Sequence, residues 1–220
     1  MDKKFKILNI ISNSLVFLLV VTSIIWIASV TEYGENQLLA SGWELLKFFT
    51  VQSNIFIGIA SLISLIYILI GSYYPRWLSI LKYVATGTVT LTFLTVMFYL
   101  GPTLGYGLML KDANLLMHLI TPVLAIAQLF LLEPKAENMR FVNTTVLSIF
   151  PMIAYGIAYL INVFVHDGYG NSKYDWYYFG TYGPGAGIGM FFLMLAFTYL
   201  IGVGLYFGYQ KIKLKDVPEI

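Results

Sequence analysis

The stretch of sequence that decides the fold is residues 44–71, ELLKFFTVQSNIFIGIASLISLIYILIG. Apart from Glu44 and Lys47 near its start, it carries no charge. It exceeds the roughly 20 mainly apolar residues that an α-helix needs to cross the hydrocarbon core of a bilayer. The six stretches of this kind are 6–29, 44–71, 77–100, 113–133, 142–165 and 185–209. The sequence therefore predicts an all-α, polytopic membrane protein with six transmembrane helices in a single domain, 1–220.

The composition indicates the same class of protein. Of the 220 residues, 59% are hydrophobic and 11% are charged, and the mean hydropathy is +0.78. A soluble domain of this length would need a polar coat that such a composition cannot supply. The net charge of +2 is too small to indicate nucleic acid as a partner. The absence of cysteine excludes disulfides, thiolate metal sites and cysteine nucleophiles.

The first apolar stretch follows three lysines and could be read as a signal peptide. It is too long for the apolar core of such a peptide, and no clear small-residue cleavage site follows it. We therefore expect it to be retained as the first transmembrane helix.

The placement of lysine and arginine predicts the orientation in the membrane. With six spans, both ends of the chain lie on one side of the bilayer. That side would hold ten cationic residues, Lys3, Lys4, Lys6, Arg76, Lys82, Lys135, Arg140, Lys211, Lys213 and Lys215, and the other side three, Lys47, Lys111 and Lys173. Because cytoplasmic loops carry the excess of lysine and arginine, we expect a cell-membrane protein with both termini in the cytoplasm.

Four of the six spans carry side chains at helical spacing that form polar stripes. These are Trp43, Lys47, Thr50, Asn54, Ser61 and Ser64 on the second span, Thr88, Thr92, Thr95 and Tyr99 on the third, Asn114, His118, Thr121, Ala125 and Gln128 on the fourth, and Tyr155, Tyr159, Asn162 and His166 on the fifth. Lipid-facing positions are rarely so polar, so the stripes should meet in a common interior. A purely structural role stays open, because small and hydroxyl residues also hold membrane helices together.

Thr50 and His118 are the strongest candidates for chemistry. A histidine inside a membrane span is costly and usually faces the bundle interior or a wet cavity. Counted from Trp43 and Ala113, the two residues lie about 10 Å and about 8 Å deep at the helical rise per residue, both in the outer half of the membrane. If the two helices are neighbours, the imidazole could take the hydroxyl proton and activate the threonine as a nucleophile. A structural role for a single buried histidine is the alternative.

Other polar residues near this depth could bind a substrate or an oxyanion: Asn54, Lys47, Gln52, Ser53, Thr121, Tyr155, Tyr159 and Asn162. Lys47 and Asn54 share the helix face of Thr50, whereas Gln52 points about 200° away on an ideal helix. No mid-membrane carboxylate is present to orient His118, so a backbone carbonyl or one of Tyr155, Tyr159, Thr121 and Asn162 would have to do so. With one further histidine, His166 near the outer surface, we expect neither a metal site nor a cofactor.

The outer segment 166–184 is densely aromatic. Its aromatic residues are Tyr169, Tyr174, Trp176, Tyr177, Tyr178, Phe179 and Tyr182. Such residues form interfacial belts in most membrane proteins, and a lid over a lipid entrance is the alternative. Asp167 and Asp175 are expected to make surface contacts of little energetic weight with Lys173 or Lys111.

Three segments resemble a known group of proteins. They are Phe49-Thr50-Val51-Gln52-Ser53-Asn54, then His118 with Pro122 and the run ending Leu132-Glu133-Pro134, and lastly Pro151, Tyr155 and Tyr159 ahead of YDWYYFG at 174–180. In these segments the chain resembles bacterial six-helix integral membrane proteins that are distantly similar to the androgen-induced membrane protein family. The eukaryotic members of that family are intramembrane threonine hydrolases of fatty acid esters of hydroxy fatty acids.

The resemblance implies a nucleophile at Thr50 and a base at His118, and Asn54 keeps the family's spacing of four residues after the threonine. It implies a fatty acid ester drawn from the membrane as the substrate. The apolar neighbours of His118 depart from the more polar family pattern, so the lipid ester could be a different one. Two other functions stay open: a transport or ligand-binding protein that uses the same polar cavity, and a structural subunit of a larger complex.

Overall fold

The computed structural model describes residues 3–29, 42–71, 74–134, 140–171 and 173–216, and every regular element within these ranges is helical. The long helices are α1 (Lys3–Ser29), α2 (Phe49–Ile70), α3 (Arg76–Thr95), α7 (Thr121–Leu131), α9 (Phe150–Val165) and α10 (Pro184–Asp216). The short elements are a 3-10 turn, η1 (Gly42–Lys47), two π-helical turns, η2 (Val96–Leu100) and η3 (Leu116–Ile120), and the helices α4 (Gly101–Leu104), α5 (Tyr106–Met109), α6 (Ala113–Leu115) and α8 (Phe141–Leu147).

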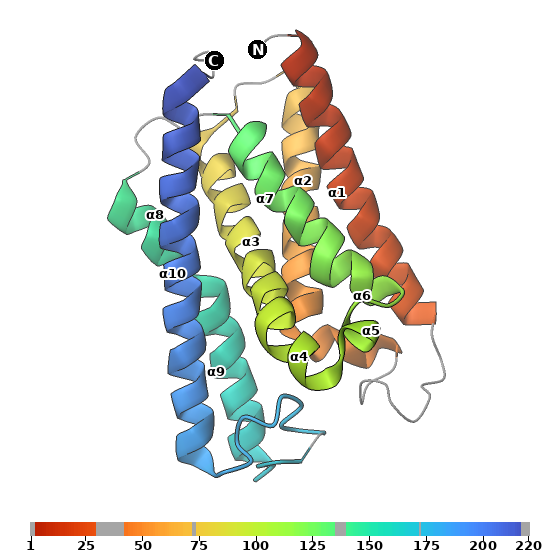
Figure 1. Cartoon of the computed structure of the whole chain (residues 1–220), viewed down its shortest axis with the longest axis vertical. Coiled ribbons are helices and arrows are strands. Elements are labelled where there is room, and N and C mark those ends of the chain that lie inside the picture. The colour runs from red at the N-terminus through yellow and green to blue at the C-terminus, as the bar shows by residue number, and fades with distance from the viewer. Residues whose placement is uncertain (1–2, 30–41, 72–73, 135–139, 172, 217–220) are drawn as a thin grey trace.

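Six of the described helical segments are long and apolar enough to cross a membrane, which confirms the predicted number of spans. They cover Lys3–Ser29, Phe49–Ile70, Arg76–Leu104, Ala113–Leu131, Phe141–Val165 and Pro184–Ile212. The beginning of α1 and the end of α10 lie at the same end of the bundle, as an even number of spans requires (Figure 1). The protein is therefore a multi-pass, all-α membrane protein.

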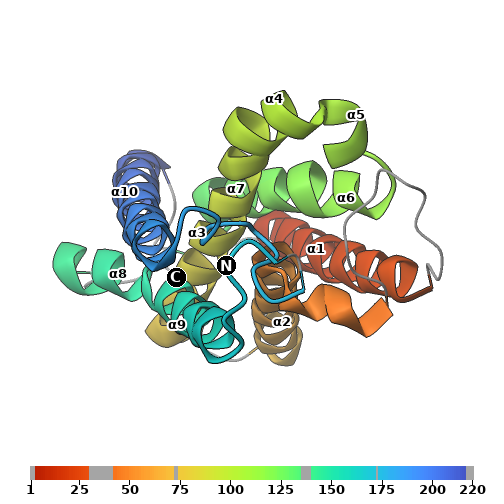
Figure 2. The ribbon, with the colours of Figure 1, turned by 90° about the horizontal axis from the view of Figure 1, so that it is seen from below.

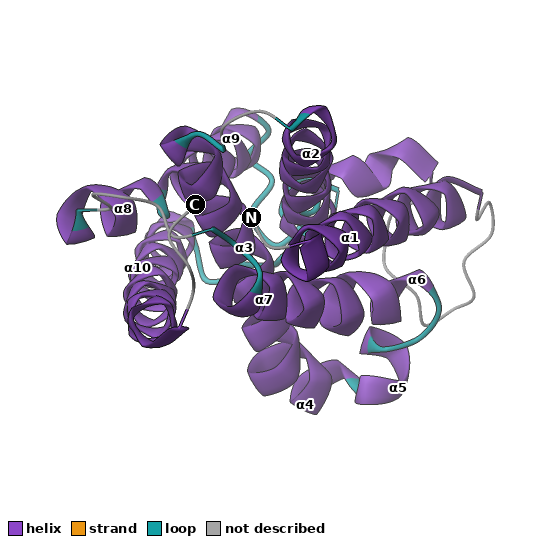
Figure 3. Ribbon diagram, turned by 90° about the horizontal axis from the view of Figure 1, so that it is seen from above, coloured by secondary structure: helices purple, strands orange, loops and turns teal. Residues whose placement is uncertain are grey.

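The helices form a four-helix group with a flank on one side. Helices α1, α2, α3 and α7 pack around a dry core, and α10 joins α8 and α9 to α3 and α7 (Figure 3). The core consists of Val16, Val20, Ile57, Ala60, Ala85, Val89 and Ala125, all of them buried. Ala125 belongs to the predicted stripe of the fourth span, so that stripe does face the bundle interior.

Prolines account for the irregular turns. Pro102 and Pro122 each follow a π-helical turn by two residues, and neither can donate a hydrogen bond to the carbonyl four residues earlier. Those carbonyls belong to Phe98 and His118, in the middle of η2 and η3. The backbone widens instead, and the amide that follows each turn bonds five residues back, Gly101 to Val96 and Thr121 to Leu116.

The predicted start of the second span was wrong. Residues 42–47 form η1, and Phe48 has extended backbone dihedrals, so α2 begins only at Phe49. Trp43 and Lys47 therefore do not continue the helix face of Thr50. Thr50 is the second residue of α2, not a residue two turns inside a helix, because the Phe48 backbone breaks the periodicity on which the depth estimate depended.

Lys82 was wrongly counted among the charges that flank the spans. It lies in the second turn of α3 with 1% of its surface exposed, so it faces the bundle interior. Removing it leaves nine cationic residues against three (10 − 1 = 9), and the bias keeps its sign. Lys135 and the side chains of Lys213 and Lys215 fall outside the described residues.

Candidate functional site

Thr50 lies at the N-terminal end of α2 and faces a small chamber. The chamber has a volume of about 100 Å³ and is lined from α3 and η2 by Thr92, Thr95 and Tyr99, among others. Tyr177 of the outer segment also lines it. Within the part of the chain that the structure describes, the Thr50 hydroxyl makes no hydrogen bond with another group. It is therefore free to meet a ligand that enters the chamber.

His118 is held in one tautomer by the backbone. The residue is 5% exposed, and its Nδ1 lies 2.7 Å from the Met109 carbonyl oxygen. A carbonyl can only accept, so Nδ1 carries the proton and Nε2 of the neutral ring carries the lone pair. Of the candidates for orienting His118, the backbone carbonyl is the one that contacts the ring. The position depends on η3, because Pro122 widens the turn that carries the histidine.

Asn54 joins the segment of the candidate nucleophile to the segment of the candidate base. Its Nδ2 donates to the Thr50 carbonyl at 2.8 Å and to the Met117 carbonyl at 3.1 Å. The side chain is fully buried, and its Oδ1 has no hydrogen-bond partner in the described structure. The second and fourth spans are thus neighbours at this level, which the sequence alone left open. Asn54 uses its amide protons for this bridge, which leaves none for an oxyanion in this arrangement.

The Thr50 hydroxyl and the His118 ring are not hydrogen-bonded to one another in the described structure. His118 lines neither of the two cavities discussed here. Asn54 connects the backbone of Thr50 to that of Met117, the residue before His118, but no hydrogen bond connects the Thr50 and His118 side chains in the described structure. The assignment of the pair as nucleophile and base stays a prediction.

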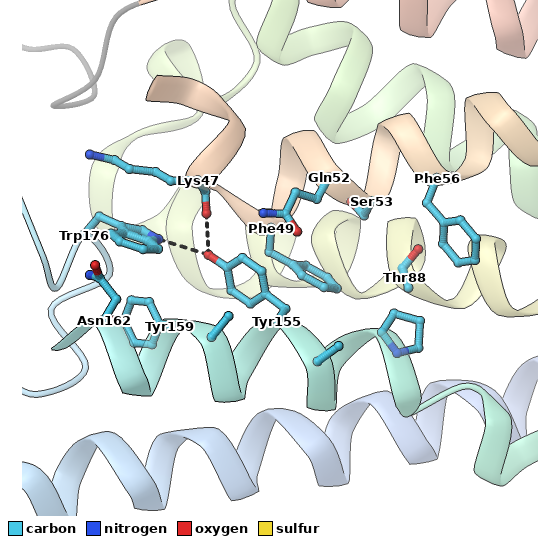
Figure 4. Close-up of a pocket in the computed structure, with 13 residues that line it drawn as sticks. Lys47, Phe49, Gln52, Ser53, Phe56, Thr88, Tyr155, Tyr159, Asn162 and Trp176 are labelled. Carbon is cyan, nitrogen blue, oxygen red and sulfur yellow. Dashed lines mark hydrogen bonds between the residues drawn. The ribbon is translucent and has the colours of Figure 1, made fainter. Parts of the chain in front are cut away.

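Most of the other predicted site residues line a second and larger cavity. It is a groove of about 510 Å³ between α2 and α9, and Lys47, Gln52, Ser53, Tyr155, Tyr159 and Asn162 are among its lining residues (Figure 4). Thr121 does not reach either cavity, since it is fully buried and its hydroxyl has no partner among the described residues. The predicted site residues therefore divide between the chamber, the groove and the buried interior of the bundle.

Two aromatic rings and one hydrogen bond separate the groove from the chamber. Phe49 and Tyr155 line both cavities, and their rings meet edge to face with centroids 5.1 Å apart. Behind them the hydroxyls of Ser53 and Thr92 are hydrogen-bonded at 3.1 Å. Thr50 lies on the chamber side of this partition.

Tyr155 is the junction between α9, η1 and the outer segment. Its hydroxyl donates to the Lys47 carbonyl at 2.8 Å and accepts from Nε1 of Trp176 at 3.0 Å (Figure 4). The Lys47 ammonium lies 5.5 Å from the centre of the Trp176 ring, a cation–π contact. Lys47 and Trp176 thus lie together at one end of the groove (Figure 4).

The outer segment is tied down by Asp175, whose predicted role as a weak surface contact was wrong. Asp175 is fully buried and accepts from the Tyr159 hydroxyl and from the backbone amides of Gly170 and Gly180. The segment between α9 and α10 crosses the end of the bundle toward α2 (Figure 2). A buried carboxylate needs such partners, and two amides from the same segment bend the backbone around it.

The aromatic residues of the outer segment divide into two groups. Trp176, Tyr177 and Phe179 pack inward against α9, whereas Tyr178 and Tyr182 are exposed. The Tyr177 hydroxyl accepts from the Phe49 amide at 2.9 Å and so caps the start of α2. Burial raises the pKa of Tyr177 to about 12, against the opposing effect of its hydrogen bonds. Tyr177 and Phe179 of the inward group line the chamber, Trp176 lines the groove, and the exposed group suits an interfacial belt.

A buried polar cluster that the sequence did not predict lies in the half of the bundle that holds the beginning of α1 and the end of α10. The Lys82 ammonium donates to Asn13 Oδ1 at 3.1 Å, Ser61 Oγ at 2.9 Å and Gln128 Oε1 at 2.7 Å, so one side chain of α3 joins α1, α2 and α7. Glu133 is also buried, and its charge acts on Lys82. The sequence feature that could have revealed this cluster is Lys82 itself, a lysine inside the otherwise apolar predicted span 77–100. The dry core lies between this cluster and the His118 region.

Within the described residues no group of three histidine, aspartate, glutamate or cysteine side chains could hold a metal ion. No protein family, characterised protein or solved structure matches the chain. The fold class therefore rests on the structure, and the function has to be proposed from the site.

Proposed function

We propose that the protein is an intramembrane hydrolase of lipid esters, with Thr50 as nucleophile and His118 as general base. The observation that carries the proposal is the hydrogen bond of His118 Nδ1 to the Met109 carbonyl. It leaves Nε2 as the basic atom of a buried imidazole, on a turn that Asn54 ties to the backbone of Thr50. The resemblance of the Thr50 and His118 segments to the androgen-induced membrane protein family supports the same roles.

The proposed reaction proceeds in two steps. His118 Nε2 takes the Thr50 proton as the hydroxyl oxygen attacks the ester carbonyl carbon, and the imidazolium then gives that proton to the departing alcohol. In the second step Nε2 takes a proton from water, whose oxygen attacks the acyl-threonine. Collapse of this intermediate releases the fatty acid and returns the proton to Thr50. No cofactor takes part.

The donors for the oxyanion would come from the chamber itself. The amide protons of Asn54 are used in the bridge to Met117, and the Lys47 ammonium lies at the end of the separate groove. The hydroxyls of Thr95 and Tyr99 line the chamber with Thr50. Catalytic hydrogen bonds often shorten only when substrate binds, so the approach of Thr50 to His118 belongs to the ligand-bound state.

The proposed orientation places both ends of the chain in the cytoplasm and the chamber toward the outer leaflet of the cell membrane. The beginning of α2, which contains Thr50, and helix α6, which directly precedes the η3 turn of His118, lie away from the end of the bundle that holds the beginning of α1 and the end of α10 (Figure 1). The nine remaining flanking cations belong to the proposed cytoplasmic side. The substrate would enter from the bilayer.

The test compares purified wild type with Thr50→Ala, Thr50→Ser and His118→Ala on a panel of fatty acid esters in detergent. Thr50→Ala should reduce hydrolysis to background, and His118→Ala should lower kcat by roughly 10²–10⁴, the usual contribution of a positioned base. Thr50→Ser, which keeps a hydroxyl, should retain part of the activity.

Matched controls come from the same chain. Thr103→Ala removes an exposed threonine, and His166→Ala removes the other histidine, which is also exposed. Both should keep wild-type activity. A wild type that is inactive on every ester, or full activity in Thr50→Ala, would overturn the proposal.

A second candidate is a lipid- or small-ligand-binding or transport protein that uses the same polar cavity. The absence of a hydrogen bond between Thr50 and His118 in the described structure favours it. A fluorophosphonate probe separates the two functions, because it reacts with an activated hydroxyl. Labelling of wild type but not of Thr50→Ala supports the hydrolase. Failure to label wild type, together with wild-type ligand binding in Thr50→Ala, supports the binding protein.

A further inference from the structure

The groove between α2 and α9 has the shape of a site for an apolar chain. Phe49, Phe56 and Pro151 line it together with two small residues of α9, Ala154 and Ala158 (Figure 4). Both alanines are exposed, and their short side chains leave the groove its width. At about 510 Å³ it has the size of a typical ligand pocket.

The groove is charged at one end only: Thr88, which lines the other end, is uncharged, and its hydroxyl donates to the Ala85 carbonyl at 2.7 Å. Lys47, Gln52 and Asn162 line its outer end, where the Lys47 ammonium packs against the Trp176 ring. Within the described structure the ammonium has no carboxylate partner, and Glu44 of the same turn does not pair with it. An unpaired cation above an apolar groove is complementary to a molecule with a negative head and an apolar tail.

The groove is separate from the chamber that contains Thr50. The Phe49–Tyr155 ring pair and the Ser53–Thr92 hydrogen bond stand between the two cavities. A molecule in the groove therefore does not lie against the Thr50 hydroxyl, and its role differs from that of a substrate in the chamber.

We propose that the groove is a second, non-catalytic lipid site that binds one acyl chain along Ala154 and Ala158 and an anionic head, carboxylate or phosphate, at Lys47. The site does not depend on the hydrolase activity. A bound lipid would hold α9 and the outer segment against α2, because Tyr155 and Trp176 connect these elements at the headgroup end.

The test measures binding to the full chain in a neutral detergent by native mass spectrometry. The probes are oleate and dioleoylphosphatidylglycerol, with oleyl alcohol and dioleoylglycerol, which lack the carboxylate and the phosphate, as their neutral counterparts. Wild type should bind an anionic probe about tenfold more tightly than its neutral counterpart, the value of one hydrogen bond to a charged group. If wild type binds oleate but not the phosphatidylglycerol, the ligand class is a free fatty acid, and the reverse result indicates a phospholipid. If both bind, the site recognises the anionic head that the two probes share.

Two variants address the two ends of the site. Lys47→Met should lose about a factor of ten in affinity for the anionic probes and little for the neutral ones. Ala158→Phe should abolish binding by filling the groove. Because Ala158 is exposed, the new ring does not enter a packed core, and the thermal midpoint of the protein without lipid should stay near that of wild type.

The matched controls are Lys173→Met, which removes an exposed lysine of the outer segment, and Ile157→Phe, which enlarges a side chain on α9 that faces away from the groove. Both controls and Thr50→Ala should bind as wild type does. Equal binding of charged and neutral probes, or unchanged binding in Ala158→Phe, would overturn the proposal. Loss of binding in Thr50→Ala would place the lipid in the chamber and would also overturn it.

Discussion

At the scale of single residues, the side chains that matter most are buried polar groups whose partners come from other spans. Asn54 contacts a carbonyl of η3, His118 contacts Met109, and Lys82 contacts three helices. In a bilayer such groups find no water, so each one constrains the position of every element it touches.

Replacing Lys82 by methionine should destabilise the protein strongly. The change leaves Asn13, Ser61 and Gln128 without their shared donor and leaves the charge of Glu133 without its neighbouring cation. Removing one partner of a buried charged pair costs about 3 kcal/mol or more. Unfolding in mixed micelles measures it, and Lys4→Met, at an exposed position, should change stability little.

A double variant tests the physical reason for this loss. Lys82→Met with Glu133→Gln removes both charges, and it should recover part of the stability that Lys82→Met alone loses. If Lys82→Met is as stable as wild type, the cluster does not hold the bundle together.

Stability should fall between pH 10 and pH 12 because of Tyr177. Its pKa is raised to about 12 by burial, so the folded protein keeps a proton that the unfolded chain loses near pH 10. The stabilising effect is complete below pH 10 and is lost as the pH rises through 12, with a slope of at most about 1.4 kcal/mol per pH unit.

Chemical unfolding at several pH values measures this slope, and Tyr177→Phe should reduce it. The slope should not vanish, because burial and the charge of Glu133 also raise the pKa of Tyr74. An identical slope in wild type and Tyr177→Phe would show that Tyr177 does not keep its proton in this range.

At the scale of elements, prolines shape the helices that carry the site. Pro122 produces the widened turn η3 that contains His118, and Pro102 follows the equivalent turn η2. A third proline, Pro151, is the second residue of α9, which begins shortly after α8 ends at Leu147. A proline cannot donate to the carbonyl four residues earlier, so each interruption can be traced to the sequence.

Pro122→Ala should detach His118 from Met109. An alanine amide can donate to the His118 carbonyl, which allows η3 to close into a regular α-helical turn and rotates the imidazole. The chain has two histidines, so ¹⁵N spectra of histidine-labelled protein can report the His118 tautomer, with His166→Ala for assignment.

The expected result for Pro122→Ala is loss of the fixed Nδ1–H tautomer together with a fall in ester hydrolysis. Pro102→Ala, which relaxes η2 and leaves η3 unchanged, serves as the matched control and should keep the wild-type spectrum. An unchanged His118 spectrum in Pro122→Ala would show that the turn does not depend on the proline.

At the scale of the whole molecule, the four-helix group of α1, α2, α3 and α7 contains two buried polar regions, one around Asn54 and His118 and one around Lys82. Helices α8, α9 and α10 pack beside this group, and α9 lines both cavities. The chamber and the groove both lie where α9 meets α2 and α3, and the outer segment covers that junction. The dry core of the four-helix group separates these cavities from the Lys82 cluster.

The absence of cysteine allows a direct test of orientation. Lys111→Cys and Asn171→Cys place a single thiol at an exposed position on the side proposed to face outward, and Lys4→Cys and Lys211→Cys do so on the other side. A membrane-impermeant maleimide applied to intact cells should label the first pair only. Labelling of the second pair alone would reverse the proposed orientation.

The sequence alone was enough for the number of spans, because membrane insertion depends on local hydropathy that each segment carries by itself. It could not show that Lys82 and Asp175 are buried, that α2 begins after Phe48, or that Thr50 and Gln52 face different cavities. These features depend on which helices are neighbours, since lipid solvates the apolar face of a helix as well as another helix does. Only the tertiary structure decides which polar groups meet, because their partners come from spans far apart in the chain, as Asn54 and Met117 do.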